Sequence, residues 1–429
     1  MSLTSALYTA VSALQAQSAA ISSVSQNIAN ASTTAYKTTG VSFQDLVTGT
    51  GNATTGNVSG GVLYSTYQNM SAQGTIQATD SNTDLAINGD GFFVVTNSDT
   101  SSTAPDYTYS RNGSFTTDAN GYLVNSEGYY LMGQATDASG NVTSGSASSL
   151  NSLTQVNTNI VSGMAQATAN VTMAANLPAD AAVGDTFNTS FEIYDSLGVS
   201  STVNQTWTKT GANEWSLAMA DPVLTSDNTT TSGTISPASA TLTFNGDGSL
   251  ASTDPATLDV TVSGFSTGAS DDTFKLNLGT AGSTTGLTQY ASNSSDPQID
   301  ISSINQDGLK YGQLTNVTVG KDGIVTANFD NGLSRAIYQI PIATFANANG
   351  LTHVNGSIYD ENEAAGNVTL HDPGEGSAGS ITASALEAST VDTSSEFSRM
   401  IVAQQAYSSA AQVVTTAKDM YDTLISMVR

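Results

Sequence analysis

The chain has 429 residues, and only 11% of them are charged, yet its formal net charge is −26. Such an acidic surface would repel phosphate and anionic lipid, which argues against a nucleic-acid-binding protein. The chain contains no cysteine, so disulfides, thiolate metal sites and thiol nucleophiles are excluded.

Two features of the sequence bear on targeting. No stretch approaches the ~18 consecutive apolar residues that span a bilayer, which predicts no membrane insertion. The N-terminus lacks the basic region and the compact apolar stretch of a cleavable signal peptide. Low lysine content, the lack of cysteine and many Ser, Thr, Asn and Gly residues suit an exported bacterial surface protein. We therefore expect export without a cleaved signal peptide.

Residues 3–28 have the pattern of an α-helix. Their apolar residues recur at alternating steps of three and four, which is typical of a coiled-coil seam about three heptads long. No charged residue precedes Lys37, so we expect this helix to be packed on several sides and to be marginal alone. The seam residues expected to mediate self-assembly are Leu7, Leu14, Ile21, Val24 and Ile28.

The segment after this helix has the composition of a connector. Asn, Ser and Thr in residues 29–40 compete for backbone hydrogen bonds, so the helix is expected to end there. Residues 48–61 (TGTGNATTGNVSGG) have the composition of a loop. We therefore assign residues 1–35 to a terminal helical domain and residues 36–75 to a connector leading to a β domain.

Strand and turn patterns fill the middle of the chain. In residues 83–132, aromatic and β-branched runs alternate with Gly, Asn and Asp turns, and the same pattern returns from about residue 310. The intervening sequence is poorer in such signals. We predict a discontinuous inner all-β domain at 76–145 and 301–384, with an outer β domain inserted at 146–300.

The last part of the chain, residues 385–429, repeats the helical pattern and completes the terminal helical domain. Its expected assembly residues are Phe397, Met400, Tyr407, Val414, Tyr421, Ile425 and Val428. Neither seam would stay exposed to water, so pairing is the simpler expectation, although each helix could instead serve a separate partner. The predicted fold is mainly β with terminal α-helices, which pair as a coiled coil beside two nested all-β domains.

No candidate catalytic or metal site stands out. The two histidines, His353 and His371, lie in Gly- and Asn-rich loops without a supporting motif. Segments such as Asn88-Gly89-Asp90-Gly91 resemble parts of calcium loops but are more typical of tight turns. Trp207 and Trp215 could mark a sugar-binding face, but core positions are favoured. We expect no catalytic, cofactor-binding or metal-binding residues, and no cofactor.

Three sequence blocks, in order along the chain, are similar to blocks of bacterial flagellar rod and hook proteins. They are residues 26–37 (QNIANASTTAYK), residues 83–93 (TDLAINGDGFF) with 111–115 (RNGSF), and residues 385–392 (ALEASTVD) followed by 396–397 (EF) and 403–407 (AQQAY). The motif residues in these blocks are Asn27, Asn30, Thr33, Tyr36, Lys37, Gly89, Gly91, Phe92, Phe93, Leu386, Glu387, Val391 and Asp392. Ala35 departs from the pattern, because Gly is usual there. Hook proteins are the nearest match, since distal rod proteins lack so long a middle.

The resemblance implies a non-enzymatic structural subunit that self-assembles into the flagellar hook, a flexible curved tube transmitting torque from rod to filament. It implies partners: further copies of the chain, the distal rod protein, the hook cap, the hook–filament junction proteins and the flagellar type III export apparatus. It also implies an extracellular location in the hook and basal body. The alternatives are a distal rod subunit of the same family, a secreted adhesin or carbohydrate-binding protein using Trp207 and Trp215, and a secreted hydrolase.

Overall fold

The computed structural model describes residues 3–47, 59–97, 106–143, 149–161, 163–292 and 296–427. An α-helix lies near each end of the chain, α1 (Leu3–Ala29) and α2 (Thr393–Met427), and strands fill the sequence between them. The predicted fold class, mainly β with terminal helices, is confirmed. Part of the loop predicted at 48–61, and Val428 of the predicted seam, lie outside the described residues.

The chain divides into two compact units. Unit 1 contains 1–160, 316–327 and 335–429, and unit 2 contains 161–315 and 328–334. Besides the two helices, unit 1 has the strands β1 (Thr39–Val47), β2 (Ser59–Gln68), β3 (Ile76–Ala78), β4 (Leu85–Asn88), β5 (Phe92–Thr96), β6 (Tyr107–Ser110), β7 (Phe115–Thr117), β8 (Leu123–Asn125), β9 (Tyr130–Ala135), β10 (Thr154–Gln155), β26 (Ser334–Gln339), β27 (Ile342–Thr344), β28 (Thr352–Asn355), β29 (Ile358–Asp360), β30 (Thr369–His371), β31 (Ser380–Ala383) and β32 (Ala385–Glu387).

The described residues of unit 2 contain strands and no helix. The strands are β11 (Gly163–Gln166), β12 (Asn170–Pro178), β13 (Thr186–Tyr194), β14 (Ser200–Gly211), β15 (Glu214–Met219), β16 (Val223–Leu224), β17 (Thr234–Ser236), β18 (Ser239–Phe244), β19 (Leu250–Asp254), β20 (Asp259–Ser263), β21 (Asp272–Asn277), β22 (Thr288–Tyr290) and β23 (Asp300–Gln306). Strands β24 (Leu309–Val319) and β25 (Ile324–Phe329) contribute residues to both units, as does β26 through Ser334.

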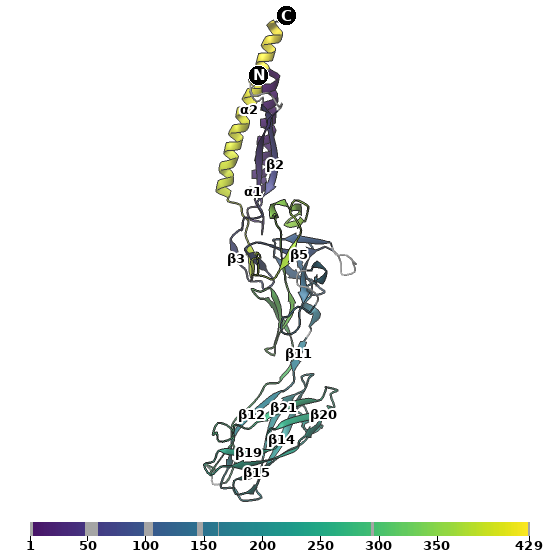
Figure 1. The fold of residues 1–429 in the computed structure, drawn as a ribbon, viewed down its shortest axis with the longest axis vertical. Helices are drawn as coiled ribbons and strands as arrows, with labels where there is room; N and C mark the ends of the chain where they lie inside the picture. Colours follow the sequence, from purple (N-terminus) through teal and green to yellow (C-terminus); the bar gives the residue numbers. More distant parts are fainter. Residues whose placement is uncertain are drawn as a thin grey trace. The chain divides into compact units, whose positions relative to one another are not determined.

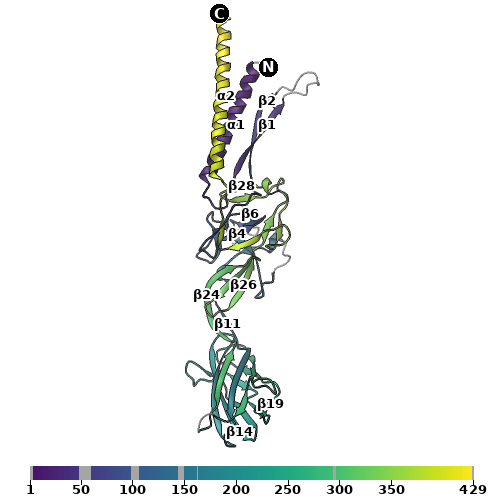
Figure 2. The ribbon, with the colours of Figure 1, turned by 90° about the vertical axis from the view of Figure 1, so that its left-hand side faces the viewer.

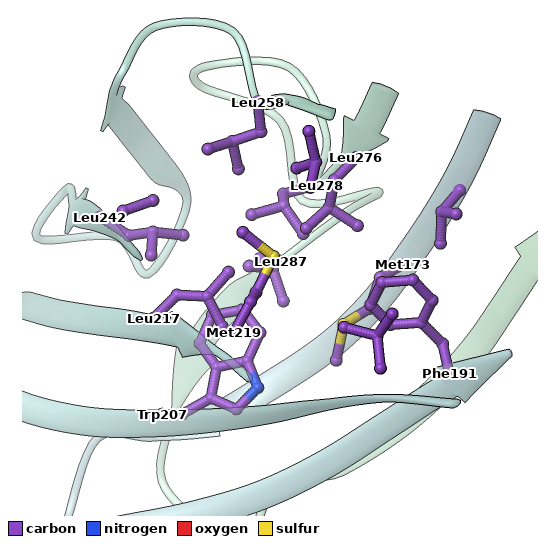
Figure 3. Packing of buried hydrophobic residues seen from close by; sticks show 14 of the residues in the cluster. Met173, Phe191, Trp207, Leu217, Met219, Leu242, Leu258, Leu276, Leu278 and Leu287 are labelled. Carbon is purple, nitrogen blue, oxygen red and sulfur yellow. The ribbon is translucent and has the colours of Figure 1, made fainter. Parts of the chain in front are cut away.

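Unit 2 is a sandwich of two sheets around one apolar core. One sheet has the order β17-β20-β21-β12-β22, with β23 also paired to β12, and the other has the order β13-β14-β15-β18-β19, with β16 paired to β14. Alternate side chains along β14 and β15 are buried, as expected when one face of each sheet covers a core. Figure 3 shows residues of both sheets, such as Met173 and Trp207, converging in this core.

The two tryptophans belong to that core. Trp207 and Trp215 are both 0% exposed, and the Trp207 indole N–H donates to Thr189 Oγ1 at 2.9 Å. A sugar-binding aromatic must present a ring to solvent. The alternative that placed these side chains on a binding face is therefore wrong.

The β part of unit 1 has a separate core. It forms where β5 lies between β6, β9 and β27, and it includes Phe92, Val94 and Tyr109. Aromatic rings pack edge to face there, and the ring centres of Tyr109 and Phe345 are 4.8 Å apart. Residues 149–160, which we predicted to belong to the inserted domain, pack here instead, because β10 pairs with β9 and both Leu153 and Val156 are buried.

The segment predicted to be a connector, 36–75, is largely an ordered hairpin. Strands β1 and β2 pair antiparallel, from Thr39 opposite Gln68 to Val47 opposite Ser59. A two-stranded hairpin is marginal alone, and this one packs along α1 (Figures 1 and 2). The backbone N–H of Val62 donates to Ser12 Oγ at 3.1 Å, which fixes the height of the hairpin on the helix.

Helices α1 and α2 lie side by side within unit 1 (Figure 2). The buried apolar residues of this layer are small or short: Ala10, Ala16 and Val24 on α1, and Ala403 and Ala417 on α2. Small side chains let two helix backbones approach closely. Within the described residues, neither helix is long and apolar enough to cross a membrane.

The C-terminal helix begins later than predicted. Residues 385–387 form β32, which pairs with β3, and α2 starts only at Thr393. Asp392 ends the extended segment and caps the helix, because its Oδ1 accepts the backbone N–H of Ser394 at 2.9 Å.

The bounds of the inserted domain also differ from the prediction. The inserted unit spans 161–315 with 328–334, compared with the predicted 146–300.

Small residues between the helices yield the first prediction. Replacing Ala403, which is buried, by Leu should force the helices apart and cost about 1–3 kcal/mol of helix-pair stability. Replacing Leu424, which is 54% exposed, by Ala should change stability by less than about 0.5 kcal/mol. Urea unfolding of the full chain, followed by circular dichroism at the helix band, measures both. Equal effects of the two substitutions would show that the pairing does not depend on small residues.

Candidate functional site

A buried carboxylate joins three distant parts of unit 1. Glu387, at the end of β32, has a side chain that is 1% exposed. Its Oε1 lies 2.7 Å from Lys37 Nζ, and its Oε2 lies 3.4 Å from Arg111 Nη1. The backbone N–H of Gly74 also donates to Oε1, at 2.7 Å. We call Lys37, Arg111 and Glu387 the ionic cluster.

The ionic cluster contains two cations and one carboxylate, so backbone carbonyls complete it. Lys37 Nζ donates to the carbonyl of Ala72, and Arg111 Nη2 donates to the carbonyl of Gly89 at 2.8 Å. The Arg111 guanidinium also lies over the Phe92 ring, 5.4 Å from its centre. Both cations are thereby held by oxygen atoms or a ring face in a site without solvent access.

Burial dominates the electrostatics of the cluster. It lowers the pKa of Lys37 and of Arg111, because desolvation disfavours the charged forms, and Glu387 opposes both shifts. A buried ion pair of this kind adds little net stability, but losing one partner is costly. Its role is therefore to specify which segments meet.

The Asn27 side chain makes a second set of polar contacts, which tie the last turn of α1 to β1 and to α2. The Asn27 side chain pairs with the backbone of Thr39: Nδ2 donates to its carbonyl at 2.9 Å, and Oδ1 accepts its N–H at 2.9 Å. Asn27 Nδ2 also lies 3.1 Å from Glu396 Oε2, in the first turn of α2. The Tyr36 hydroxyl donates to Asn27 Oδ1 at 3.2 Å. One amide thus links α1, the start of β1 and the start of α2.

The backbones of the two chain ends run alongside one another between these polar contacts. The N–H of Ala35 donates to the carbonyl of Glu387 at 2.8 Å, and the N–H of Thr390 donates to the carbonyl of Tyr36 at 3.1 Å. The N–H of Thr38 donates to Thr390 Oγ1 at 3.0 Å. Residues 35–38 and 387–390 therefore form one junction.

Ala35 explains why Gly is usual at its position in the resembling proteins. Its φ is 56°, in the left-handed region that glycine adopts most easily, and its side chain is buried. Ala35 adopts this left-handed conformation with a Cβ, which carries a cost of about 1–2 kcal/mol.

Six of the thirteen predicted motif residues lie in this junction or contact its side chains. Asn27, Tyr36, Lys37, Gly89, Phe92 and Glu387 take part directly. Asn30 and Thr33 bond to one another just after α1, Leu386 and Val391 are half-buried beside Glu387 and Asp392, and Phe93 packs on Phe115 with ring centres 5.7 Å apart. Gly91 has φ 124° and leaves no room for a Cβ beside Ile342.

Sequence reasoning missed three members of the junction. Arg111 and Glu396 lie within the similar blocks but were not among the predicted motif residues, and Gly74 lies outside those blocks. The sequence did carry a signal for Arg111. The chain has ten Lys and Arg residues in total, and two of them, Lys37 and Arg111, lie in motif segments that are otherwise uncharged. Gly74 is required because a Cβ there would collide with the carbonyl oxygen of Ala388.

The predicted assembly residues are divided between packed and exposed positions. Val24 is buried, and Leu7, Leu14, Ile21, Ile28, Met400, Val414 and Tyr421 are half-buried. Phe397, Tyr407 and Ile425 are 54%, 42% and 63% exposed, although they were expected in the same seam. The fully buried apolar positions of α2 are Ala403 and Ala417, which were not among the predicted seam residues and which alternate with the half-buried Met400, Val414 and Tyr421.

The histidines make ordinary local contacts. His353 Nε2 lies 2.8 Å from the carbonyl oxygen of Gly356 in the β28–β29 turn, and its ring centre is 5.6 Å from that of Tyr359. His371 is half-buried in β30. Among the described residues, no group of His, Asp and Glu is arranged to hold a metal ion.

Four known sequence families match successive parts of the chain. Residues 7–37 match the flagella basal body rod protein family, and residues 86–175 match the flagellar hook protein FlgE/F/G D1 domain. Residues 165–309 match the flagellar basal body protein FlaE D2 domain, and residues 382–427 match the flagellar basal body rod FlgEFG protein C-terminal family. The matched segments contain all three members of the ionic cluster.

Whole proteins are similar over their full lengths. The flagellar hook protein FlgE of Brucella suis biovar 1 is 35% identical over 436 residues, covering 100% of both chains. That of Rhizobium meliloti is 32% identical, also over 100% of both. The flagellar hook protein FlgE of Salmonella typhimurium is 33% identical over 97% of this chain and 98% of its own.

The ionic cluster yields the second prediction. Replacing Glu387 by Ala leaves Lys37 and Arg111 buried without a counter-charge, which should cost about 3–5 kcal/mol. Replacing the exposed Glu375 by Ala is the control and should cost less than about 0.5 kcal/mol. Chemical denaturation of the full chain measures both free energies of unfolding. Similar values would show that water reaches the two cations and that the cluster does not hold the junction.

Proposed function

Because this chain belongs to the flagellar hook protein family, we propose that its two chain ends and their junction form the self-assembling part of the subunit. The protein is a structural subunit of the flagellar hook, and members of this family polymerise within the flagellum. The finer assignment is that α1 and α2 build the wall of the hook tube, the flexible joint that transmits torque from rod to filament.

The observation that carries this proposal is the contrast between the junction and the helices it anchors. The junction is buried and tied by ion pairs, whereas α2 leaves large apolar side chains such as Ile401, Ile425 and Met427 exposed by 57%, 63% and 79%. Exposed apolar faces of this kind mark interaction sites. Copies of the same chain are the natural partners in a polymer.

The domain division supports the same assignment. The match of residues 165–309 to a D2 domain family favours unit 2 as the inserted domain, and the match of residues 86–175 to a D1 domain family favours the β part of unit 1 as the inner one. We propose that neither carries catalysis or a cofactor and that both act as scaffolding.

We further propose the partners and the route of the subunit. Its neighbours would be the distal rod protein, the hook cap and the hook–filament junction proteins. Export would pass through the flagellar type III apparatus without cleavage, to an extracellular site. An uncharged α1 supports this route, because a marginal helix threads a channel unfolded and becomes ordered when neighbours bury it.

Truncation provides the third prediction. Removing residues 1–35, or residues 395–429, keeps Lys37, Arg111 and Glu387 and should leave a soluble β protein that cannot polymerise. Sedimentation and electron microscopy detect the polymer, and circular dichroism reports the fold. A truncated chain that still forms tubes would contradict the role of the chain ends.

The same proposal distinguishes hook from rod in cells. A strain lacking this protein should lose its hooks and keep its rods, which electron microscopy of isolated basal bodies can establish. Loss of the rod itself would instead support the distal rod alternative. Re-expression of the full chain is the control and should restore hooks.

A further inference from the structure

A groove opens at the base of the helical layer, next to the junction. It lies between α1, β1 and α2 and has a volume of about 520 Å³. Its apolar lining comes from Ala20, Val24, Val41, Phe43, Val402 and Ala406. We call it the base groove.

The base groove is open to solvent rather than filled by its own chain. Phe43 and Val402, on opposite sides of it, are 47% and 65% exposed. Its charged lining residues, Glu396 and Arg399, pair with one another at 2.9 Å. The groove therefore presents an apolar and nearly neutral surface on a chain whose net charge is −26.

The opposite side of α2 carries a matching projection. Phe397 and Ile401 are 54% and 57% exposed and lie one turn apart, so they form one apolar knob. Polar residues follow on that face, including Gln404 and Ser408, both exposed. Packing within the chain does not account for the knob.

The positions of the knob and groove fit a repeating contact. At about 100° per residue, Phe397 and Ile401 point about 140° around α2 from Val402 and Ala406, which line the groove. At about 1.5 Å per residue, the two pairs differ in height by only about 8 Å. The knob of a chain faces away from its own groove, so only another copy can bring the two together.

We propose that the Phe397–Ile401 knob of one copy inserts into the base groove of a second copy. Because every chain carries both surfaces on opposite sides, the contact is heterologous and passes from copy to copy. Because the knob and the groove differ little in height along α2, the contact runs laterally around the tube. The knob is apolar and the groove is nearly neutral, so their contact adds little charge repulsion between the acidic chains. This inference rests on the proposed polymeric function and names the pair of surfaces.

Engineered cysteines test the contact directly, because the chain has none of its own. The double variant Phe43→Cys with Ile401→Cys should give an oxidation-dependent ladder of multiples of the chain mass in the assembled full-length polymer. The matched control, Phe43→Cys with Ser408→Cys, moves the second cysteine two turns along the same face of α2 and should give no ladder. The unassembled chain should give none with either pair.

The outcomes separate this inference from the function on which it rests. Polymers that form without a ladder, or with equal ladders from both pairs, would overturn the knob-and-groove contact and leave the polymer role intact. An adduct in cells with a protein of different mass would assign the groove to another partner and overturn it as well. A wild-type chain that never polymerises would overturn the polymer role and the contact together.

A charge substitution gives a second, independent readout. Ile401→Asp should raise the lowest concentration that supports polymer by about tenfold or more, because burial of an Ile side chain is lost. Ser408→Asp adds the same charge on the same face and should leave that concentration within about twofold. Ile401→Leu should assemble normally. Equal effects of the two Asp substitutions would contradict docking by the knob.

Discussion

The contact between Glu387 and Lys37 is the constraint on which unit 1 depends. These residues are 350 positions apart, and their atoms meet at 2.7 Å in a site without solvent access. The carbonyls of Ala72 and Gly89 help to accommodate two cations around one carboxylate there, and the buried Arg111 Nε makes no hydrogen bond to the described residues. Burial makes any other pairing of these segments costly, so the cluster selects a single arrangement of the two chain ends.

That arrangement sets where the helices can go. Asn27 in the last turn of α1 bonds Glu396 in the first turn of α2, so the helices leave the junction already paired. Beyond it the fully buried apolar residues of α2 are alanines, and larger side chains such as Met400 and Val414 are only half-buried, so little apolar surface is fully buried. The helical layer is therefore anchored at one end and weakly stabilised along its length. In the proposed polymer, neighbouring copies supply the remaining burial, which would couple ordering of the helices to assembly.

The sequence pattern predicted where helices and strands lie better than it predicted which of them pair. The three-and-four spacing predicted both helices, and Gly- and Asn-rich turns predicted β domains between them. The glycine-rich run 48–61 predicted a connector, but the aromatic and β-branched residues that flank it form the hairpin β1–β2. The helix predicted from 385 starts at Thr393, because Glu387 is drawn into a strand by charges far away in sequence. The assembly roles of the seam residues remain predictions.

The sequence alone determined the order of elements, the family resemblance and the motif residues Asn27, Lys37 and Glu387. These follow from local periodicity and from residue types at fixed spacing. Only the tertiary structure decided that those residues meet, that Arg111 joins them, and that Phe397 and Ile401 face outward while Ala403 faces α1. The reason is that a heptad pattern shows which residues share a helix face, whereas the size of side chains on the partner decides which face is buried.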